Sequence, residues 1–401
     1  MEVTVNRKDF PMLLKDYIYF DNGATTFKPR CVIDSMNDYY FNYCANAHRG
    51  DYDISQKADS LYEDARDVVK KFINANSRKE IIFTKGTTDS INMIVFGFMK
   101  NYLKKDDEVL ITKMEHASNV LPWYKLEEEI GIKVKFIPLE NNLVTLSNVE
   151  KTITDKTKVI SIAHITNTYG DIRDIKEIAK IAHKHNIFIC VDGAQSVPHI
   201  KTDVLDLDID FLSFSSHKML GPTGVGVLYG KEVLLERMIP LTLGGGMNNF
   251  FESDKTYEYK ELPLRLEAGT QNIAGVIGLR KAIKYLSKIG FDKIFEHELE
   301  LKKYLVKKLK EIDNVTIYNE NTSSGIVLFN INNIFAEDTS RYLNHYKICV
   351  RAGNHCAKMV KDQLNIKNTC RVSLYIYNTK EEIDKFIEVM KNNRDIFKVI
   401  L

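Results

Sequence analysis

Short apolar runs alternate with segments of helical pattern along residues 81–229. Strands that are joined through helices lie parallel, because each crossover returns the chain to the same end of the sheet. The pattern therefore predicts an α/β domain with a mainly parallel central sheet. We predict helices at 89–102 and 174–185, and strands at 81–83, 108–111, 134–137, 159–163, 187–191, 211–214 and 226–229.

The pattern changes from about residue 274 onwards. Helical stretches are predicted at 282–289 and 294–311, followed by strands at 326–331 and 371–376 and a closing helix at 380–393. This mixture is typical of a smaller α+β domain. Because 401 residues exceed what one compact core usually holds, we expect two domains. We place the large domain at 15–285 and the small domain at 286–401 together with 1–14.

The composition excludes several classes of protein. The 56 basic residues nearly balance the 54 acidic ones, and a net charge of +2 gives no reason to expect a nucleic acid as partner. The sequence has no run of about 18 apolar residues, so we expect no membrane-spanning helix. The segment 1–15 lacks the apolar centre of a secretion signal. We therefore expect a cytoplasmic protein.

Polar side chains follow several of the predicted strands closely. Thr87, His116, Asn167, Asp192 and Ser215 each stand just beyond the end of one of them. In an open parallel sheet, ligands bind beyond the carboxyl ends of the strands. We therefore expect these side chains to share one site.

Lys218 follows the strand at 211–214 and precedes a glycine-rich segment at 221–226. A lysine at the end of a strand is usually just solvated. Here, however, small hydroxyls and glycine backbone suit a phosphate, which N–H donors bind well. A lysine amine can also form a Schiff base with a bound aldehyde. Taken by itself, Lys218 leaves both interpretations open.

Asp192 also has two interpretations. An aspartate directly after a buried strand often caps the next helix. Alternatively, its carboxylate stabilises a protonated pyridine nitrogen, and that proton makes pyridoxal phosphate (PLP) an electron sink. One strand with its connections separates Asp192 from Lys218, so both side chains can reach one cofactor from neighbouring strands.

Seven ordered segments carry a resemblance to a known family. They are the N-terminal segment 19–26, the turn 85–92, the segment 114–123 with His116, Asn119, Pro122 and Trp123, the pair Asp192 and Gln195, the group Ser215, His217 and Lys218, the loop 351–357, and 371–374. Together they resemble the class-V aminotransferase-fold PLP enzymes, and among these the SufS-type cysteine desulfurases. The match covers about residues 18 to 393 and implies fold type I of the PLP-dependent transferases.

The resemblance implies how PLP is held. Lys218 would bind it covalently and move protons at the substrate Cα, and His116 would stack on the ring and act as acid or base. Without the family, His116 is equally well a plain polar residue at a strand end. The other cofactor residues would be Asp192 at the pyridine nitrogen, Gln195 and Asn167 at the phenolic oxygen, Thr87, Thr88, Ser215 and His217 at the phosphate, and Thr270 at the phosphate of a partner subunit. A shared site of that kind implies a homodimer.

The resemblance also implies L-cysteine as substrate and names its contacts. Arg371 would bind the substrate carboxylate with a bidentate fork. His48 and Arg49 resemble a pair near the entrance, whose roles stay open. The residues expected at the substrate are Arg371, Asn167, Asn22, Ala24 and Arg351.

Cys356 stands apart from the other cysteines. The chain has six, without a C-x-x-C pair, and a buried small side chain is the ordinary role for each. Cys356 instead lies in a polar loop with Arg351 and Lys358 close in sequence, and a nucleophilic thiol has to be accessible and partly ionised. The resemblance implies that Cys356 takes the sulfur of L-cysteine as a persulfide and leaves alanine. No metal is needed, and His183 and His185 do not share a helix face, so we expect no zinc site.

The chain departs from the SufS-type pattern at three places. The cysteine loop reads Gly-Asn-His-Cys where His-His-Cys is usual, Gly23 stands where alanine is common, and the segment 358–361 lacks a frequent proline. The resemblance suggests a SufE- or SufU-like acceptor protein that feeds iron–sulfur cluster assembly. Because 15 positions separate Cys356 from Arg371, we expect a short reach of the sulfur and low turnover without an acceptor.

Competing functions remain open at this level. Another class-V enzyme, such as an aminotransferase, would keep Lys218, Asp192 and Arg371 but would not need Cys356. A selenocysteine lyase would use the same residues as a desulfurase. A non-catalytic scaffold would regulate a sulfur-assembly partner and would not bind PLP.

Overall fold

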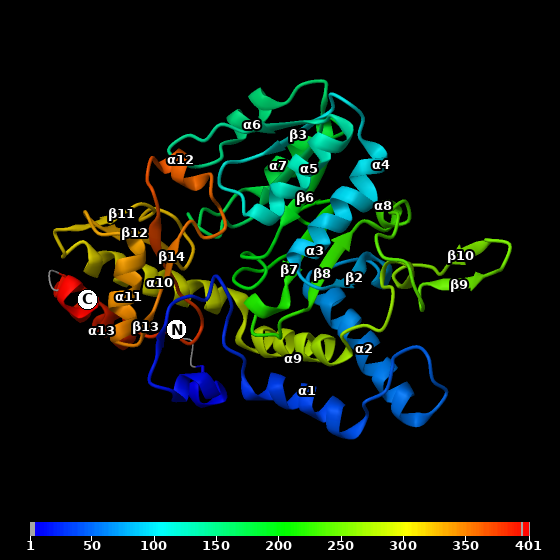
Figure 1. Cartoon of the computed structure of the whole chain (residues 1–401), viewed down its shortest axis with the longest axis horizontal. Helices are drawn as coiled ribbons and strands as arrows, with labels where there is room; N and C mark the ends of the chain where they lie inside the picture. The colour runs from blue at the N-terminus through cyan, green and yellow to red at the C-terminus, as the bar shows by residue number, and fades with distance from the viewer. Residues whose placement is uncertain (1–4, 394–395, 401) are drawn as a thin grey trace.

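The computed structural model describes residues 5–393 and 396–400, and the largest feature is a twisted sheet covered by helices on both faces (Figure 1). Its strand order is β2-β8-β7-β6-β5-β3-β4. The strands are β2 Ile81–Thr84, β3 Glu108–Ile111, β4 Lys133–Phe136, β5 Thr157–Ala163, β6 Phe188–Asp192, β7 Phe211–Ser215 and β8 Gly226–Gly230.

The sheet is mainly parallel, as the sequence predicts. Strand β8 runs antiparallel to both β7 and β2, and the pairs β7–β6, β6–β5, β5–β3 and β3–β4 are parallel. The carboxyl ends of β5, β6 and β7 therefore meet at one edge. Each predicted strand of this domain is present, with bounds that differ by no more than two residues.

Alternate side chains of each strand enter different cores, because successive residues of a strand point to opposite faces. Leu212 and Phe214 join the core beneath one face, whereas Phe211 joins the core above the other. Both faces are apolar, so the strands read as nearly continuous hydrophobic runs. Several helices add to each core: α1 Arg30–Asn42, α2 Asp53–Phe72, α6 Leu146–Thr152, α7 Ile175–Lys184 and α9 Ile273–Ile289 on the first face, and α5 Leu121–Ile130 and α8 Glu232–Leu235 on the second.

The helix after β2 begins two residues earlier than predicted. Helix α3 spans Thr87–Asn92 and continues through a π-helical stretch, Met93–Met99, into α4, Lys100–Tyr102. Gly86 is its N-cap. Thr87 and Thr88 are therefore first-turn residues, whose backbone N–H groups have no acceptor within the helix.

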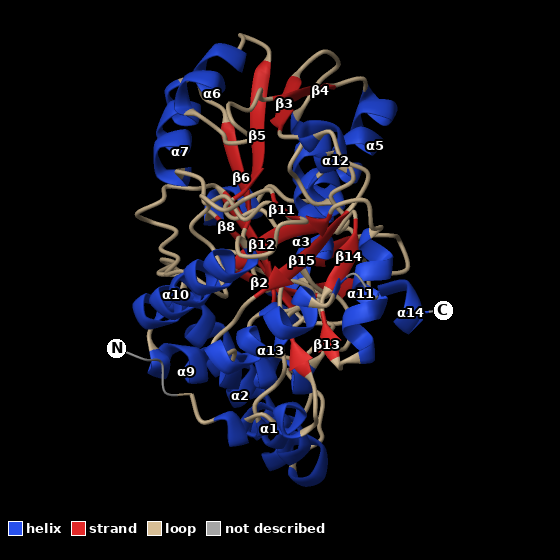
Figure 2. Cartoon of the chain, turned by 90° about the vertical axis from the view of Figure 1, so that its left-hand side faces the viewer, coloured by secondary structure: helices blue, strands red, loops and turns tan. Residues whose placement is uncertain are grey.

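A second sheet lies beside the first and has the strand order β11-β12-β15-β14 (Figure 2). Its pairs are antiparallel, and it packs with helices around a core of its own. The elements are β11 Val315–Ile317, β12 Ile326–Ile331, β14 Arg351–Gly353, β15 Thr369–Ser373, α10 Phe291–Leu309, α11 Ala336–His345, α12 Val360–Leu364, α13 Lys380–Lys391 and α14 Ile396–Ile400. Strand β15 begins and ends earlier than the predicted 371–376. The division of the chain at 285 and 286 stays a prediction.

Two further strand pairs lie outside these sheets. The short strands β1, Ile18–Tyr19, and β13, Ile348–Cys349, pair in parallel and join the N-terminal segment to the second sheet. The hairpin of β9, Asn248–Phe251, and β10, Tyr257–Tyr259, projects from the body of the molecule (Figure 1). The sequence analysis does not predict this hairpin.

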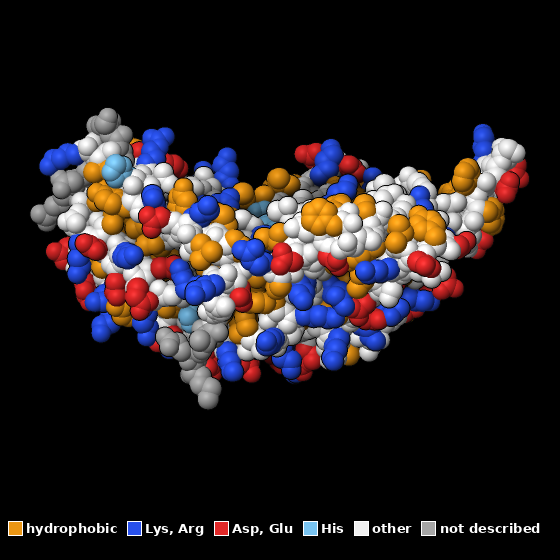
Figure 3. Space-filling view, turned by 90° about the horizontal axis from the view of Figure 1, so that it is seen from below, with side chains coloured by type: hydrophobic (Ala, Val, Ile, Leu, Met, Phe, Trp, Pro, Cys, Tyr) orange, Lys and Arg blue, Asp and Glu red, His pale blue; other side chains and the backbone are white. Residues whose placement is uncertain are grey.

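Charged side chains of both signs are interspersed over the face seen in Figure 3, in keeping with the balanced composition. Within the described residues, no helix combines the length and the hydropathy that a membrane crossing needs. Part of the segment 1–15, namely residues 1–4, lies outside the described residues.

Candidate active site

A cavity of about 190 Å³ opens at the carboxyl ends of β5, β6 and β7. The last residues of these strands, Ala163, Asp192 and Ser215, all line it. The structure thus gathers the polar side chains that the strand-end rule predicts to lie together. Predicted site residues in its wall are Ala24, Thr87, Thr88, His116, Asn167, Asp192, Gln195, Ser215, His217, Lys218 and Arg351.

Lys218 and Asp192 bring opposite charges to this cavity. Lys218 ends the 3-10 turn Ser216–Lys218, directly after β7. Burial lowers the pKa of its amine to about 8, and the carboxylate of Asp192 partly opposes that shift. Asp192 accepts a hydrogen bond of 2.9 Å at Oδ1 from the backbone N–H of Ala194. Burial raises the pKa of the Asp192 carboxyl to about 6.

The start of α3 forms another wall of the cavity. The N–H of Thr87 donates to Oγ of Ser215 at 2.8 Å, and the hydroxyls of the two residues are 2.7 Å apart. Free first-turn N–H groups and the helix dipole attract an anion to such a position. Glycine is required where β8 passes this turn, because a Cβ on Gly226 would lie 2.4 Å from Cα of Gly86.

His116 lines the cavity with its ring held by Ser118. The N–H of Ser118 donates to Nδ1 of His116 at 3.1 Å, so Nε2 carries the proton of the neutral ring. Burial lowers the pKa of His116 to about 4, and Lys218 adds to the shift. The hydroxyl of Ser118 also lies 2.7 Å from that of Thr88. Sequence reasoning missed Ser118, although it stands within the histidine motif.

A buried ion pair involves Glu115, the residue that precedes His116. Glu115 and Arg173 bind each other, and their side chains are almost fully buried. Oε2 of Glu115 accepts from the N–H of Ala163 at 2.8 Å and from Nδ2 of Asn119 at 2.9 Å. This network ties the ends of β3 and β5 together. The acidic residue beside His116 was a signal in the sequence, but its partner Arg173 is 58 residues away along the chain.

His217 is tied to the N-terminal segment through its backbone. Its carbonyl accepts from the N–H of Thr26 at 3.0 Å and from the hydroxyl of Thr25 at 3.1 Å. Burial, together with Lys218 and Lys28, lowers the pKa of its imidazole to about 4. His217 is therefore neutral near pH 7 and lies beside the lysine amine.

Gln195 and Asn167 also line the cavity. Nε2 of Gln195 donates to the carbonyl of Gly23 at 2.8 Å. Nδ2 of Asn167 donates to the carbonyl of His355 at 2.7 Å. Oδ1 of Asn167 is buried and has no hydrogen-bond partner among the described residues. A buried acceptor without a partner is costly, so this oxygen is placed for a donor from a bound molecule.

Arg371 and Asn22 are close to the cavity but do not line it. Arg371 is fully buried, with Nη1 donating to the carbonyl of Asn167 and Nη2 to Asp21, both at 2.7 Å. Nδ2 of Asn22 donates to the carbonyl of Ser373 at 2.8 Å, and its oxygen accepts from the hydroxyl of Tyr377. The substrate contacts of Arg371 and Asn22 stay predictions, and the side chain of Asn22 is already engaged within the fold.

Cys356 is exposed and does not line the cavity itself, but it contacts a residue that does. Nη2 of Arg351, which lines the cavity, lies 3.2 Å from Sγ of Cys356. His355 and Cys356 both have left-handed backbone angles, with φ of 51° and 58°. The neighbour His355 is buried, and its Nε2 lies 2.9 Å from the hydroxyl of Thr369. The loop reads Gly-Asn-His-Cys instead of the usual His-His-Cys, and its remaining histidine, His355, anchors the loop through Thr369.

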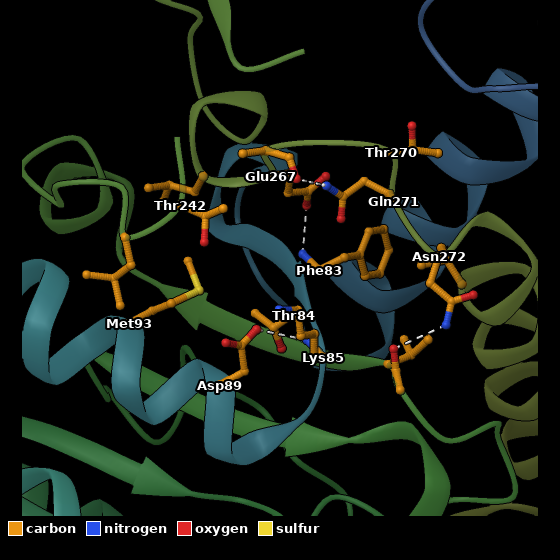
Figure 4. A pocket seen from close by; sticks show the side chains of 16 residues that line it. Phe83, Thr84, Lys85, Asp89, Met93, Thr242, Glu267, Thr270, Gln271 and Asn272 are labelled. Carbon is orange, nitrogen blue, oxygen red and sulfur yellow. Dashed lines mark hydrogen bonds between the residues drawn. The ribbon is translucent and has the colours of Figure 1, made fainter. Parts of the chain in front are cut away.

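Thr270 lies in a different cavity, of about 270 Å³ (Figure 4). Figure 4 shows Thr270 at the upper right, with Asn272 below it and Lys85 lower down near the centre. Nδ2 of Asn46 donates to its hydroxyl at 3.3 Å. The structure therefore does not bring Thr270 to the Lys218 cavity of its own chain. A role at the site of a partner subunit stays a prediction.

His48 and Arg49 also lie outside the Lys218 cavity. Nε2 of His48 lies 3.3 Å from Glu63, and this hydrogen bond raises the pKa of His48. Arg49 packs beside Gly245 and Gly246.

The comparison with known proteins places the chain. A model of the aminotransferase class-V family matches residues 18–386. The chain belongs to this family. A probable cysteine desulfurase of Halalkalibacterium halodurans is 43% identical over 98% of both chains, and one of Borreliella burgdorferi is 45% identical over 96% of this chain and 94% of that protein. The solved apo structure of a cysteine desulfurase from Thermococcus onnurineus NA1 has a TM-score of 0.93 at 38% identity and covers 96% of each chain.

These comparisons confirm the predicted fold, the enzyme class, cysteine desulfurase, and the cofactor, PLP. The residues of the cavity fit that cofactor. A carboxylate, a lysine amine and the first turn of α3 face one space of suitable polarity, and the unpartnered Oδ1 of Asn167 lies in its wall. The assignment to the SufS-type subgroup stays a prediction.

Proposed function

We propose that this enzyme converts L-cysteine to L-alanine and stores the sulfur on Cys356 as a persulfide, from which an acceptor protein takes it for iron–sulfur cluster assembly. The single observation that carries the proposal is the position of Arg351. Its side chain lines the Lys218 cavity and also contacts Sγ of Cys356 at 3.2 Å. Substrate held in the cavity is therefore close to the thiol.

The cavity residues would divide the binding of PLP between them. The cofactor supplies an electron sink that weakens the bonds at Cα and Cβ of the bound amino acid. Asp192 would hold the pyridine N–H, and Thr87, Thr88, Ser215 and His217 would hold the phosphate at the start of α3. Lys218 would attach the cofactor and move the proton at Cα. His116, neutral near pH 7, would stack on the ring.

Apart from the electron sink that the cofactor would supply, the sulfur transfer needs only the Cys356 thiolate and the substrate. The thiolate attacks the substrate sulfur, so that an S–S bond forms while the Cβ–S bond breaks. The electron pair of the broken bond stays with Cβ, which takes up a proton and becomes the methyl group of alanine. L-cysteine and the enzyme thiol thus give L-alanine and an enzyme persulfide, with atoms and electrons in balance.

The anchoring of the cysteine loop supports the need for an acceptor that docks. His355 is buried before Cys356, and Ala357 and Val360 pack after it against Met114 and Tyr169. The carbonyl of Cys356 accepts from the N–H of Ala117 at 2.7 Å. A loop held on both sides cannot carry sulfur far. A SufE- or SufU-like protein would therefore have to dock at the loop and take the sulfur where the persulfide forms. We propose that this happens in the cytoplasm.

We propose a homodimer in which Thr270 serves the phosphate of the partner subunit. The segment before Thr270 is fixed by Glu267, whose Oε1 accepts from the N–H of Phe83 at 2.7 Å and from Nη1 of Arg66 at 2.8 Å. Thr270 itself is exposed and borders a cavity of its own, so its hydroxyl is accessible to a contact across an interface.

Alanine formation from L-cysteine tests the proposed function. Purified PLP-loaded enzyme is assayed with L-cysteine, with L-selenocysteine and with other amino acids, each with and without a SufE- or SufU-like protein. We expect alanine from L-cysteine at a low rate that the acceptor raises. Equal rates with and without every acceptor would contradict the docking step, and turnover of selenocysteine alone would favour the lyase.

A further inference from the structure

Arg371 already has a carboxylate partner within its own chain. Its guanidinium donates at 2.7 Å to Oδ1 of Asp21, and the other end donates at 2.7 Å to the carbonyl of Asn167. The arginine side chain has an exposed fraction of 0%, whereas that of Asp21 is 23% exposed. The pair therefore joins a fully buried cation to an anion that can reach solvent.

The absence of a side chain at position 23 makes room for this arrangement. A Cβ on Gly23 would lie 3.0 Å from Cζ of Arg371, which is tighter than ordinary contact. The backbone of Gly23 is itself held, because its N–H donates to Oγ of Ser373 and its carbonyl accepts from Gln195, both at 2.8 Å. Gly23 lines the cavity and packs against Arg371, which does not line it.

A second carboxylate would compete with Asp21 for the guanidinium. A buried arginine without an anion is strongly unfavourable, so Asp21 stabilises it in the absence of substrate. Two carboxylates beside one guanidinium repel each other. Nε of Arg371 is buried and has no hydrogen-bond partner among the described residues. The edge formed by Nε and Nη2 matches the two oxygens of one carboxylate, once Asp21 leaves Nη2.

We propose that Asp21 is the resident counter-ion of Arg371, and that the α-carboxylate of the amino-acid substrate displaces it. The inference rests on the proposed role of Arg371 as the carboxylate-binding residue. Asp21 is then a residue that sets substrate affinity through Arg371 rather than a catalytic residue. An amine without a carboxylate cannot displace Asp21, so it leaves the Arg371–Asp21 pair intact and is not held by Arg371.

The test is a titration that needs no turnover. PLP-loaded wild type and the Asp21→Asn variant are titrated with L-alanine, and the dissociation constant is read from the cofactor absorbance. Asparagine keeps the size and one acceptor but removes the competing charge, so we expect L-alanine to bind about fivefold more tightly or better. L-alaninamide, which lacks the carboxylate, should bind both proteins equally. L-alanine should also raise the unfolding temperature of the variant more than that of wild type.

Two further variants, Arg371→Gln and Asp21→Asn combined with Arg371→Gln, distinguish the proposed role of Arg371 from that of Asp21. If Arg371→Gln leaves the affinity for L-alanine unchanged, the proposed role of Arg371 is wrong, and the inference falls with it. If Arg371→Gln weakens L-alanine binding but Asp21→Asn does not strengthen it, only the role of Asp21 is wrong. Because Asp21 acts through Arg371, Asp21→Asn should have no effect on L-alanine binding in the Arg371→Gln background. The variant Asp21→Glu, which keeps the charge, serves as control should Asp21→Asn fold poorly, and it should not tighten binding.

Discussion

Nη2 of Arg351 lies 3.2 Å from Sγ of Cys356, at the point where the exposed cysteine loop meets the wall of the Lys218 cavity. At this distance the guanidinium can donate a hydrogen bond to the sulfur and hold it in place. The same side chain borders the space for the substrate. Arg351 therefore links the binding of the amino acid to the reactivity of the thiol that receives its sulfur.

Replacing Arg351 should make Cys356 less reactive. In Arg351→Ala, we expect the alkylation of Cys356 by iodoacetamide to slow about two- to fivefold, the scale of a charge pair near solvent. The rate is followed by mass spectrometry of the peptide that carries Cys356. Lys358→Ala removes a positive charge from the same loop and should change the rate little. If alkylation slows equally in both variants, the effect comes from the net charge of the loop and not from the contact between Arg351 and Cys356.

The incorporation of PLP should depend on pH through Lys218. Only the neutral amine reacts with an aldehyde, and burial lowers the pKa of this amine to about 8. The rate of covalent attachment to cofactor-free protein should therefore rise about tenfold per pH unit below 8 and level off above it. Absorbance after rapid mixing gives this rate. A rate that still rises between pH 9 and 10 would mean that the amine is not buried as described.

The affinity for PLP should weaken in acid because of Asp192. Burial raises the pKa of this carboxyl to about 6 in the cofactor-free protein, so its ionised form is present above that pH and lost below it. The dissociation constant of PLP should increase as the pH falls through 6, by up to about tenfold per unit. Asp192→Asn should remove this pH dependence and lower kcat about a hundredfold or more. Fluorescence titration from pH 5 to 8 provides the measurement.

The buried pair of Glu115 and Arg173 should contribute strongly to stability. Arg173→Met leaves two buried carboxylates without this partner, because Nε of Arg173 also donates to Asp171 at 3.0 Å. Such a loss costs about 3–5 kcal/mol of the free energy of unfolding. Lys347→Gln breaks an exposed pair with Asp16 and should have little effect. Urea unfolding of the cofactor-free proteins compares the two variants. Similar small losses in both would contradict the stabilising role of the network around Glu115 and Arg173.

Much of the site follows from strand ends alone. Thr87, His116, Asn167, Asp192 and Ser215 come together because parallel strands deliver their carboxyl ends to one edge. The strands themselves are recognisable because they are apolar on both faces. The family resemblance then adds roles that neither pattern nor spacing provides.

Other features depend on contacts between distant parts of the chain. The pairs Arg371–Asp21 and Glu115–Arg173 join residues that no local pattern relates. The hairpin of β9 and β10 was missed because its side chains are largely exposed and its strands are only four and three residues long. Thr270 faces a cavity of its own, which a single sequence does not distinguish from the Lys218 cavity.

Intact-mass and peptide-mass analysis after reaction with L-cysteine tests the central claim most directly. PLP-loaded wild type and Cys356→Ala are mixed with L-cysteine without reductant, and both alanine and the protein mass are quantified. We predict alanine together with a gain of about 32 Da on the Cys356 peptide of wild type, the mass of one persulfide sulfur, and neither product in the variant. Alanine formation by Cys356→Ala at the wild-type rate, or a sulfur adduct on another cysteine, would contradict the account.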